Sequence, residues 1–140
     1  MNIWVNGCFD ILHIGHLNLL EFAKHLRDQN SKFLRLNRLI VGIDRDRRVK
    51  ELKGTDRPIN NENDRKRMLE SLAVVDEVVI YNTEDEMCDF ISMFNIDYIV
   101  IGDDYKDKKV LCRNFSENDV VFFTKDEHSS TDIIDKIKKS

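Results

Sequence analysis

Residues 3–16 read IWVNGCFDILHIGH. The stretch opens with a short apolar run that is typical of a buried strand, and Leu17, Leu20 and Ala23 then recur at the spacing of a helix face. Gly7 lies between the two patterns, where a glycine permits a tight turn. The stretch therefore predicts a strand that leads through a short loop into a helix.

Further strand and helix signals alternate along the rest of the chain. Apolar runs predict strands at residues 39–43, 77–81, 98–101 and 120–123, and apolar residues at helical spacing predict helices at about 68–72, 87–94 and 133–137. The segment 44–61, which contains the only proline, is predicted to be mostly loop. This alternation favours a five-stranded, mainly parallel sheet with helices on both faces. Such sheets bind ligands beyond the carboxyl ends of their strands.

The composition is that of one globular domain, which we expect to span residues 1–140. The chain has 140 residues, of which 41% are hydrophobic, and its formal net charge is −4. An acidic balance gives no general support for a nucleic-acid or membrane-surface partner. If the chain binds a phosphate, its positive charge must be concentrated locally.

The cysteines and the N-terminal residues favour a cytoplasmic protein. Cys8, Cys88 and Cys112 are widely spaced, and an odd count without a CxxC pair predicts reduced thiols rather than a disulfide framework. The first residues lack the basic and apolar regions of a signal peptide. No apolar stretch approaches the ~18 residues that span a bilayer.

His13 and His16 lie at the predicted start of the first helix. Free backbone N–H groups and the helix dipole favour an anion there. Imidazole N–H groups donate to phosphate oxygens, and they do so more strongly as charge grows in a transition state. Two alternatives stay open: one histidine caps the turn while the other is exposed, or His13, His16, His25 and Cys8 form a metal site that lacks a fourth ligand at useful spacing.

Positive charge is concentrated in residues 44–57, where six of fourteen residues are Lys or Arg. The segment follows the second predicted strand and so lies at the same sheet edge as the histidines. A charge run is usually a solvated face, but this location favours contact of one or two lysines with a phosphate. A nucleic-acid site is a weaker alternative, because no aromatic residue interleaves these charges.

Three hydroxyl side chains, Ser129, Ser130 and Thr131, precede the last predicted helix. Such residues cap a helix and can also bind phosphate at its N-terminus. Capping needs only one hydroxyl, so the run of three makes a phosphate site a reasonable hypothesis.

Together these residues resemble the cytidylyltransferase-like family of nucleotidyltransferases. Residues 7–16 look like its GxFDxxHxGH signature, and residues 129–134 look like the end of its RTEGISTT signature. Residues 75–79 match a recurrent VDEV segment, and residues 101–105 resemble the GDD/GGD segment after the fourth strand. The resemblance covers nearly the whole chain and implies a single Rossmann-like domain.

The resemblance implies a reaction in which a phosphorylated sugar or polyol attacks the α-phosphorus of CTP or ATP, and pyrophosphate leaves. It also implies Mg²⁺ with the nucleotide and a homodimer. The acidic net charge adds the expectation of no nucleic-acid or membrane partner. The residues that the resemblance makes catalytic are His13, His16 and Lys50. The residues that it makes nucleotide-binding are Gly7, Cys8, Phe9, Asp10, Gly15, Lys53, Arg65, Gly102, Asp103, Ser129, Ser130 and Thr131.

Within the family, the sequence lies between two branches. Residues 49–60 and the Gly-Cys-Phe-Asp form of the first signature are similar to the nucleotidyltransferase domain of ADP-heptose synthase, an ATP user. Residues 75–78 and 102–104 look more like glycerol-3-phosphate cytidylyltransferase, a CTP user. The family Arg and Gly of the second signature fall at Thr124 and Glu127, which motivates an alternative: a non-catalytic nucleotide-binding module with the same fold. Extra residues at 27–37 are candidates for oligomer contacts.

Overall fold

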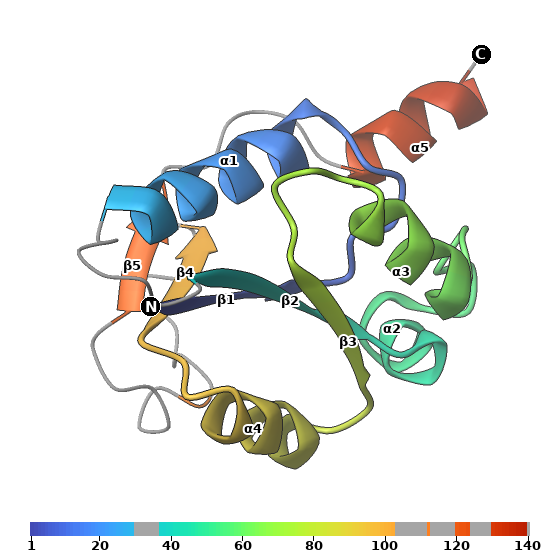
Figure 1. Cartoon of the computed structure of the whole chain (residues 1–140). Coiled ribbons are helices and arrows are strands. Elements are labelled where there is room, and N and C mark those ends of the chain that lie inside the picture. The colour runs from blue at the N-terminus through green and yellow to red at the C-terminus, as the bar shows by residue number, and fades with distance from the viewer. Residues whose placement is uncertain (30–36, 103–111, 113–119, 124–129, 140) are drawn as a thin grey trace.

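The computed structural model describes residues 1–29, 37–102, 112, 120–123 and 130–139. Its centre is a sheet of strand order β3-β2-β1-β4-β5, in which each pair of neighbours is parallel (Figure 1). The strands are β1 (Asn2–Gly7), β2 (Arg38–Asp44), β3 (Glu77–Tyr81), β4 (Tyr98–Gly102) and β5 (Val120–Phe123). The helices are α1 (Ile14–Gln29), α2 (Asp46–Lys53), α3 (Glu62–Glu70), α4 (Glu84–Met93) and α5 (Ser130–Lys139). The predicted five-stranded parallel sheet is confirmed.

Alternation along the strands divides the core between the two faces of the sheet. Ile3, Val5 and Val41 point toward α1 and α3, whereas Trp4 and Ile40 point toward α4. Figure 1 shows α1 and α3 on one side of the sheet and α4 on the other, as predicted. Because both faces are covered, the strands are apolar nearly throughout, and this property made them visible in the sequence.

The Trp4 indole fills the space over the centre of the sheet. A Cβ atom added to Gly42, which pairs with Asn6 on β1, would lie 2.3 Å from Cζ2 of Trp4. A real side chain at position 42 would therefore displace the indole. Position 42 requires glycine for space and not for an unusual backbone angle.

Helix α2 was not predicted, because the sequence suggested mostly loop between residues 44 and 61. Its only buried residue is Val49, so it has no apolar stripe for periodicity to detect. Asp46 in its first turn and Lys50 and Lys53 in its last turn complement the helix dipole. Gly54, at φ 100°, ends it.

Other boundaries differ from the predictions mainly by extension at the helix ends. α1 continues to Gln29, and Arg27 in its last turn is buried in ion pairs with Asp28 and Asp76. Arg27 therefore contributes to the packing of the chain itself, and residues 30–36 of the segment expected to make oligomer contacts lie outside the described residues. None of the helices in the described residues is both long and apolar enough to cross a bilayer.

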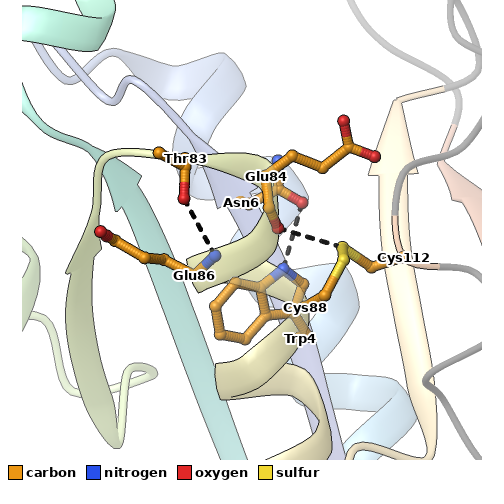
Figure 2. The surroundings of a disulfide bond; sticks show 7 residues. All are labelled: Trp4, Asn6, Thr83, Glu84, Glu86, Cys88 and Cys112. Carbon is orange, nitrogen blue, oxygen red and sulfur yellow. Dashed lines mark hydrogen bonds between the residues drawn. A yellow bond between two sulfur atoms is a disulfide. The ribbon is translucent and has the colours of Figure 1, made fainter.

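Two of the three cysteines form a disulfide, so the prediction of reduced thiols is wrong for Cys88 and Cys112. Their sulfur atoms are bonded at 2.02 Å, and Cys8 is a buried free thiol. Figure 2 shows the bond beside the Trp4 indole, with Sγ of Cys112 3.7 Å from the carbonyl oxygen of Glu84. The sequence could not show the pairing, because packing of the α4 face brings together cysteines that are 24 residues apart.

Reduction of this disulfide is expected to lower the melting temperature of the chain. The bond closes a 24-residue separation, which corresponds to about 3 kcal/mol in the chain-entropy model and to about 10 °C for a chain of this size. The measurement is thermal unfolding followed by circular dichroism, with and without a dithiol reductant. A double variant, Cys88→Ser with Cys112→Ser, is the control and should not respond. An unchanged melting temperature of the unmodified chain would contradict the prediction.

Candidate functional site

The candidate site lies where the order of the strands reverses. From β1 the chain moves to β2 and β3 on one side, and β4 and β5 are on the other side of β1 (Figure 1). Ligands in open parallel sheets bind at the carboxyl ends of the two strands that flank such a reversal. Gly7 ends β1 and Gly102 ends β4, so these glycines mark the expected ligand position.

The loop after β1 has an unusual backbone. Phe9 and Ile11 adopt φ angles of 52° and 54°, which are uncommon for residues with a side chain and rarest for a β-branched one such as Ile11. The Phe9 ring lies against Gly7, where an added Cβ would be 3.2 Å from its Cε2, and its centroid is 5.2 Å from that of His16. A side chain at position 7 would therefore have to displace the Phe9 ring by a few tenths of an ångström. Strained backbone such as that of Phe9 and Ile11 is typical of functional sites.

The two histidines are fixed by backbone hydrogen bonds at the start of α1. Nδ1 of His13 accepts from the N–H of Gly15 at 3.0 Å, and Nδ1 of His16 accepts from the N–H of His13 at 3.2 Å. The ring centroids are 3.9 Å apart. An Nδ1 that accepts a hydrogen bond places the proton of the neutral ring on Nε2. Both rings therefore carry an Nε2–H donor at a helix N-terminus, which is suited to an anion.

The alternative functions of the histidines fit less well. His13 does cap the helix, but His16 also accepts a backbone N–H, so the second ring is not simply an exposed side chain. His25 lies about 13 Å from His16 along the helix axis and contacts Gln29. Among the described residues, no three His, Cys, Asp or Glu side chains gather closely enough to hold a metal ion.

Most of the positive charge in residues 44–57 is neutralised within the chain. Its four arginines each form an ion pair, namely Arg45 with Glu62, Arg47 with Glu51, Arg48 with Asp44 and Arg57 with Asp10. Within the described part of the chain, no carboxylate is in ion-pair distance of Lys50 or Lys53, which lie exposed on α2. Because its four arginines are paired, the segment has little positive charge left for a nucleic acid, whereas Lys50 and Lys53 can contact a phosphate.

Lys53 lies close enough to Cys8 to lower the pKa of its thiol. Burial raises the pKa of the Cys8 thiol, and among the nearby charges Lys53 lowers that pKa the most. Lys53 therefore acts electrostatically on the loop after β1. Lys50, one turn earlier on α2, has no such effect on Cys8.

Sequence reasoning missed a polar network that joins the carboxyl ends of β1, β2 and β3. The hydroxyl of Tyr81 lies near the side chains of Asp44 and Asn6, and Asp44 accepts from Arg48 at 2.9 Å. The Arg48 guanidinium also lies over the Tyr81 ring at 5.6 Å. Burial raises the pKa of Tyr81, and the Asp44 charge raises it further. The sequence did contain a signal for this network, because each of these three strands ends on or next to a polar residue after an apolar run.

Two predicted nucleotide ligands have side chains that are buried inside the chain. The side chains of Asp10 and Arg65 are 0% exposed, and their polar atoms contact other parts of the chain. Direct contact of these two side chains with a nucleotide does not fit this geometry. The charges were visible in the sequence but their burial was not.

The other predicted residues are placed as follows. Cys8 and Phe9 are buried in the loop after β1, and Gly15 lies in the first turn of α1. Ser130 and Thr131 are the first two residues of α5. Asp103, Ser129, Thr124 and Glu127 lie outside the described residues.

Comparison with known proteins gives a consistent result over almost the whole chain. A model of the cytidylyltransferase-like family matches residues 4–136. The bifunctional protein HldE of Campylobacter fetus subsp. fetus is 43% identical over 136 residues, which are 97% of this chain and 28% of that protein. The bifunctional protein HldE of Helicobacter acinonychis is 39% identical over 138 residues, which are 99% of this chain and 28% of that protein. The chain thus spans less than a third of the length of these curated relatives.

A solved structure has the same architecture. The lipopolysaccharide core biosynthesis protein from Thermoplasma volcanium GSS1 superimposes with a TM-score of 0.69 at 25% sequence identity. The match covers 91% of this chain and 98% of that one.

Proposed function

Because the chain belongs to the cytidylyltransferase-like family, we propose that it transfers CMP or AMP from CTP or ATP to a small phosphorylated sugar or polyol and releases pyrophosphate. One observation carries this proposal beyond family membership. Two Nε2–H donors, fixed by backbone hydrogen bonds, lie side by side at a helix N-terminus beside the reversal point of the sheet. This arrangement suits an α-phosphate that gains negative charge during displacement.

In the proposed reaction, an anionic phosphate oxygen of the acceptor attacks the α-phosphorus. The bond from that phosphorus to the bridging oxygen breaks, and pyrophosphate leaves with the electron pair. The acceptor oxygen is already ionised, so no proton transfer is needed and no covalent enzyme intermediate forms. His13 and His16 donate to the phosphate oxygens, and positioning with charge neutralisation supplies the rate enhancement. Backbone N–H groups near Cys8 and Phe9 hold the phosphates, and Lys50 and Lys53 neutralise the nucleotide and acceptor phosphates.

We expect Mg²⁺ to arrive with the nucleotide. Mg²⁺ in nucleotide-dependent enzymes is usually held by substrate phosphates and water with one or two carboxylates, so nucleotide oxygens would be its main ligands here. The resemblance also makes a homodimer part of the proposal, and the cytoplasmic location expected from the sequence stays a prediction. Ser129, Ser130, Thr131, Gly102 and Asp103 complete the proposed nucleotide site.

The direct test is pyrophosphate release with ATP or CTP and a panel of sugar and polyol phosphates. The resemblance of residues 49–60 to the ADP-heptose synthase domain puts ATP with a heptose-1-phosphate-like sugar first in the panel, followed by CTP with glycerol 3-phosphate. We expect turnover with one nucleotide and one class of acceptor. A nucleotide that raises the melting temperature without any turnover across the panel would instead support the non-catalytic binding module.

A further inference from the structure

Arg65 on α3 is buried at the centre of the segments that carry the proposed site. Its Nη1 donates to the carbonyl oxygens of Cys8 at 2.9 Å and Asp44 at 2.8 Å. Its Nη2 donates to Oδ1 of Asp46 at 2.6 Å, and its Nε donates to the carbonyl oxygen of Asn60 at 3.0 Å. One guanidinium therefore joins the loop after β1, the end of β2, the start of α2 and the segment before α3.

Asp10 makes a second buried connection between the same parts of the chain. Its Oδ2 accepts from the N–H of Ile59 at 2.7 Å and from Nε of Arg57 at 3.2 Å, and its Oδ1 accepts from the N–H of Asn60 at 2.9 Å. Asn60 is thus held from both sides, because its N–H donates to Asp10 and its carbonyl accepts from Arg65. We call these two residues with their partners the Asp10–Arg65 brace.

The brace contacts a part of the backbone that is strained. Asp10 lies between Phe9 and Ile11, both at positive φ, and Cys8 adjoins them. Residues in such conformations persist only where the surroundings fix them. The anchors on either side of this strained turn are the carbonyl of Cys8 and the carboxylate of Asp10, and both belong to the brace.

We propose that Arg65 and Asp10 are positioning residues that hold the strained loop before His13 and His16 in register with α2 and its lysines. Neither side chain is exposed to touch a substrate, so both act through the loop and through the start of α2. The inference rests on the proposed function for its catalytic consequence but not for its geometry. A lysine at position 65 keeps the charge beside Asp46 but cannot present a planar set of donors to four acceptors at once.

The test compares Arg65→Lys with Arg27→Lys. Arg27 is also a buried arginine, but it forms ion pairs with Asp28 and Asp76. Asp76 also accepts from the N–H of Leu39 near the start of β2. Arg27 therefore lies at the opposite edge of the sheet from the histidines. Both variants are expected to lower the melting temperature. Arg65→Lys alone is expected to lower kcat/KM for the nucleotide, by about tenfold, because small displacements of positioned groups are costly in rate.

Cys8 supplies a readout that needs no substrate. It is the free thiol beside the brace, it is buried, and burial raises its pKa, so it should react slowly with iodoacetamide. Loosening of the loop in Arg65→Lys is expected to speed its alkylation about tenfold, since labelling of a buried group follows local opening. Peptide mass spectrometry identifies Cys8 specifically. Arg27→Lys is expected to leave this rate unchanged.

Equal Cys8 alkylation rates in the two variants would overturn the brace. Faster alkylation in Arg65→Lys but not in Arg27→Lys supports the brace, whether or not the unmodified chain turns over any substrate. A lack of turnover in the unmodified chain would refute the proposed function and leave the brace standing. Asp10→Asn is the second variant if Arg65→Lys does not fold, because it retains the size of the side chain and weakens the bond to Arg57. It is expected to speed Cys8 alkylation in the same way.

Discussion

His16→Asn is expected to lower kcat by about 10²–10³-fold, the loss that follows removal of one donor to a developing oxyanion. The asparagine oxygen can still accept the N–H of His13, which Nδ1 of His16 accepts in the structure. The variant therefore keeps the backbone hydrogen bond at the start of α1 and removes the imidazole ring with its Nε2–H donor. Because that donor is proposed to act mainly on the charge of the transition state, the nucleotide-induced rise in melting temperature should change much less than kcat.

His25→Asn is the matched control for this experiment. His25 lies on the same helix and is exposed, and its ring contacts Gln29, away from the proposed site. Its kcat should stay within about twofold of the unmodified chain, as is usual for a surface change. Near-normal turnover in His16→Asn would rule out the proposed role of this histidine, whatever the result for His25.

The sheet was predictable from sequence because its strands are covered on both faces. Runs such as 77–81 and 120–123 are apolar nearly throughout, and the structure has strands at those residues. Helix α2 was not predictable in the same way, since Val49 is its only buried residue. Periodicity detects burial, and a helix that buries one side chain gives almost no periodic signal.

The local part of the site was predictable, and the part that depends on tertiary packing was not. His13 and His16 could be placed at a helix start because both residues and the helix are adjacent in sequence. Arg65 was predicted to bind the nucleotide because it matches a family arginine after the charged loop, but its side chain is 0% exposed, which led to the proposed positioning role. The Asn6–Tyr81 contact joins two strands that are far apart in sequence, so no motif could contain it.

Lys53→Met is expected to raise the KM for the nucleotide by about 10- to 150-fold, the equivalent of the roughly 1.5–3 kcal/mol of one charged hydrogen bond. Methionine is nearly as good a helix former as lysine, so α2 should persist. Lys50→Met, one turn away, should act mainly on the KM for the acceptor phosphate or on kcat, because Lys50 does not affect the Cys8 loop. Arg47→Met is the control, since Arg47 is exposed and paired with Glu51 on the same helix.

The same variant has a second, independent consequence for the Cys8 thiol. The positive charge of Lys53 lowers the pKa of Cys8 against the effect of burial, so removal of that charge must raise the pKa further. The pH profile of Cys8 alkylation should therefore move to higher pH in Lys53→Met and stay in place in Arg47→Met. If both variants gave the same profile and the same nucleotide KM, Lys53 would be an ordinary surface lysine. If only Lys53→Met shifts both quantities, one ammonium group acts on the loop after β1 and on the nucleotide, as expected for a triphosphate that lies between α2 and the start of α1.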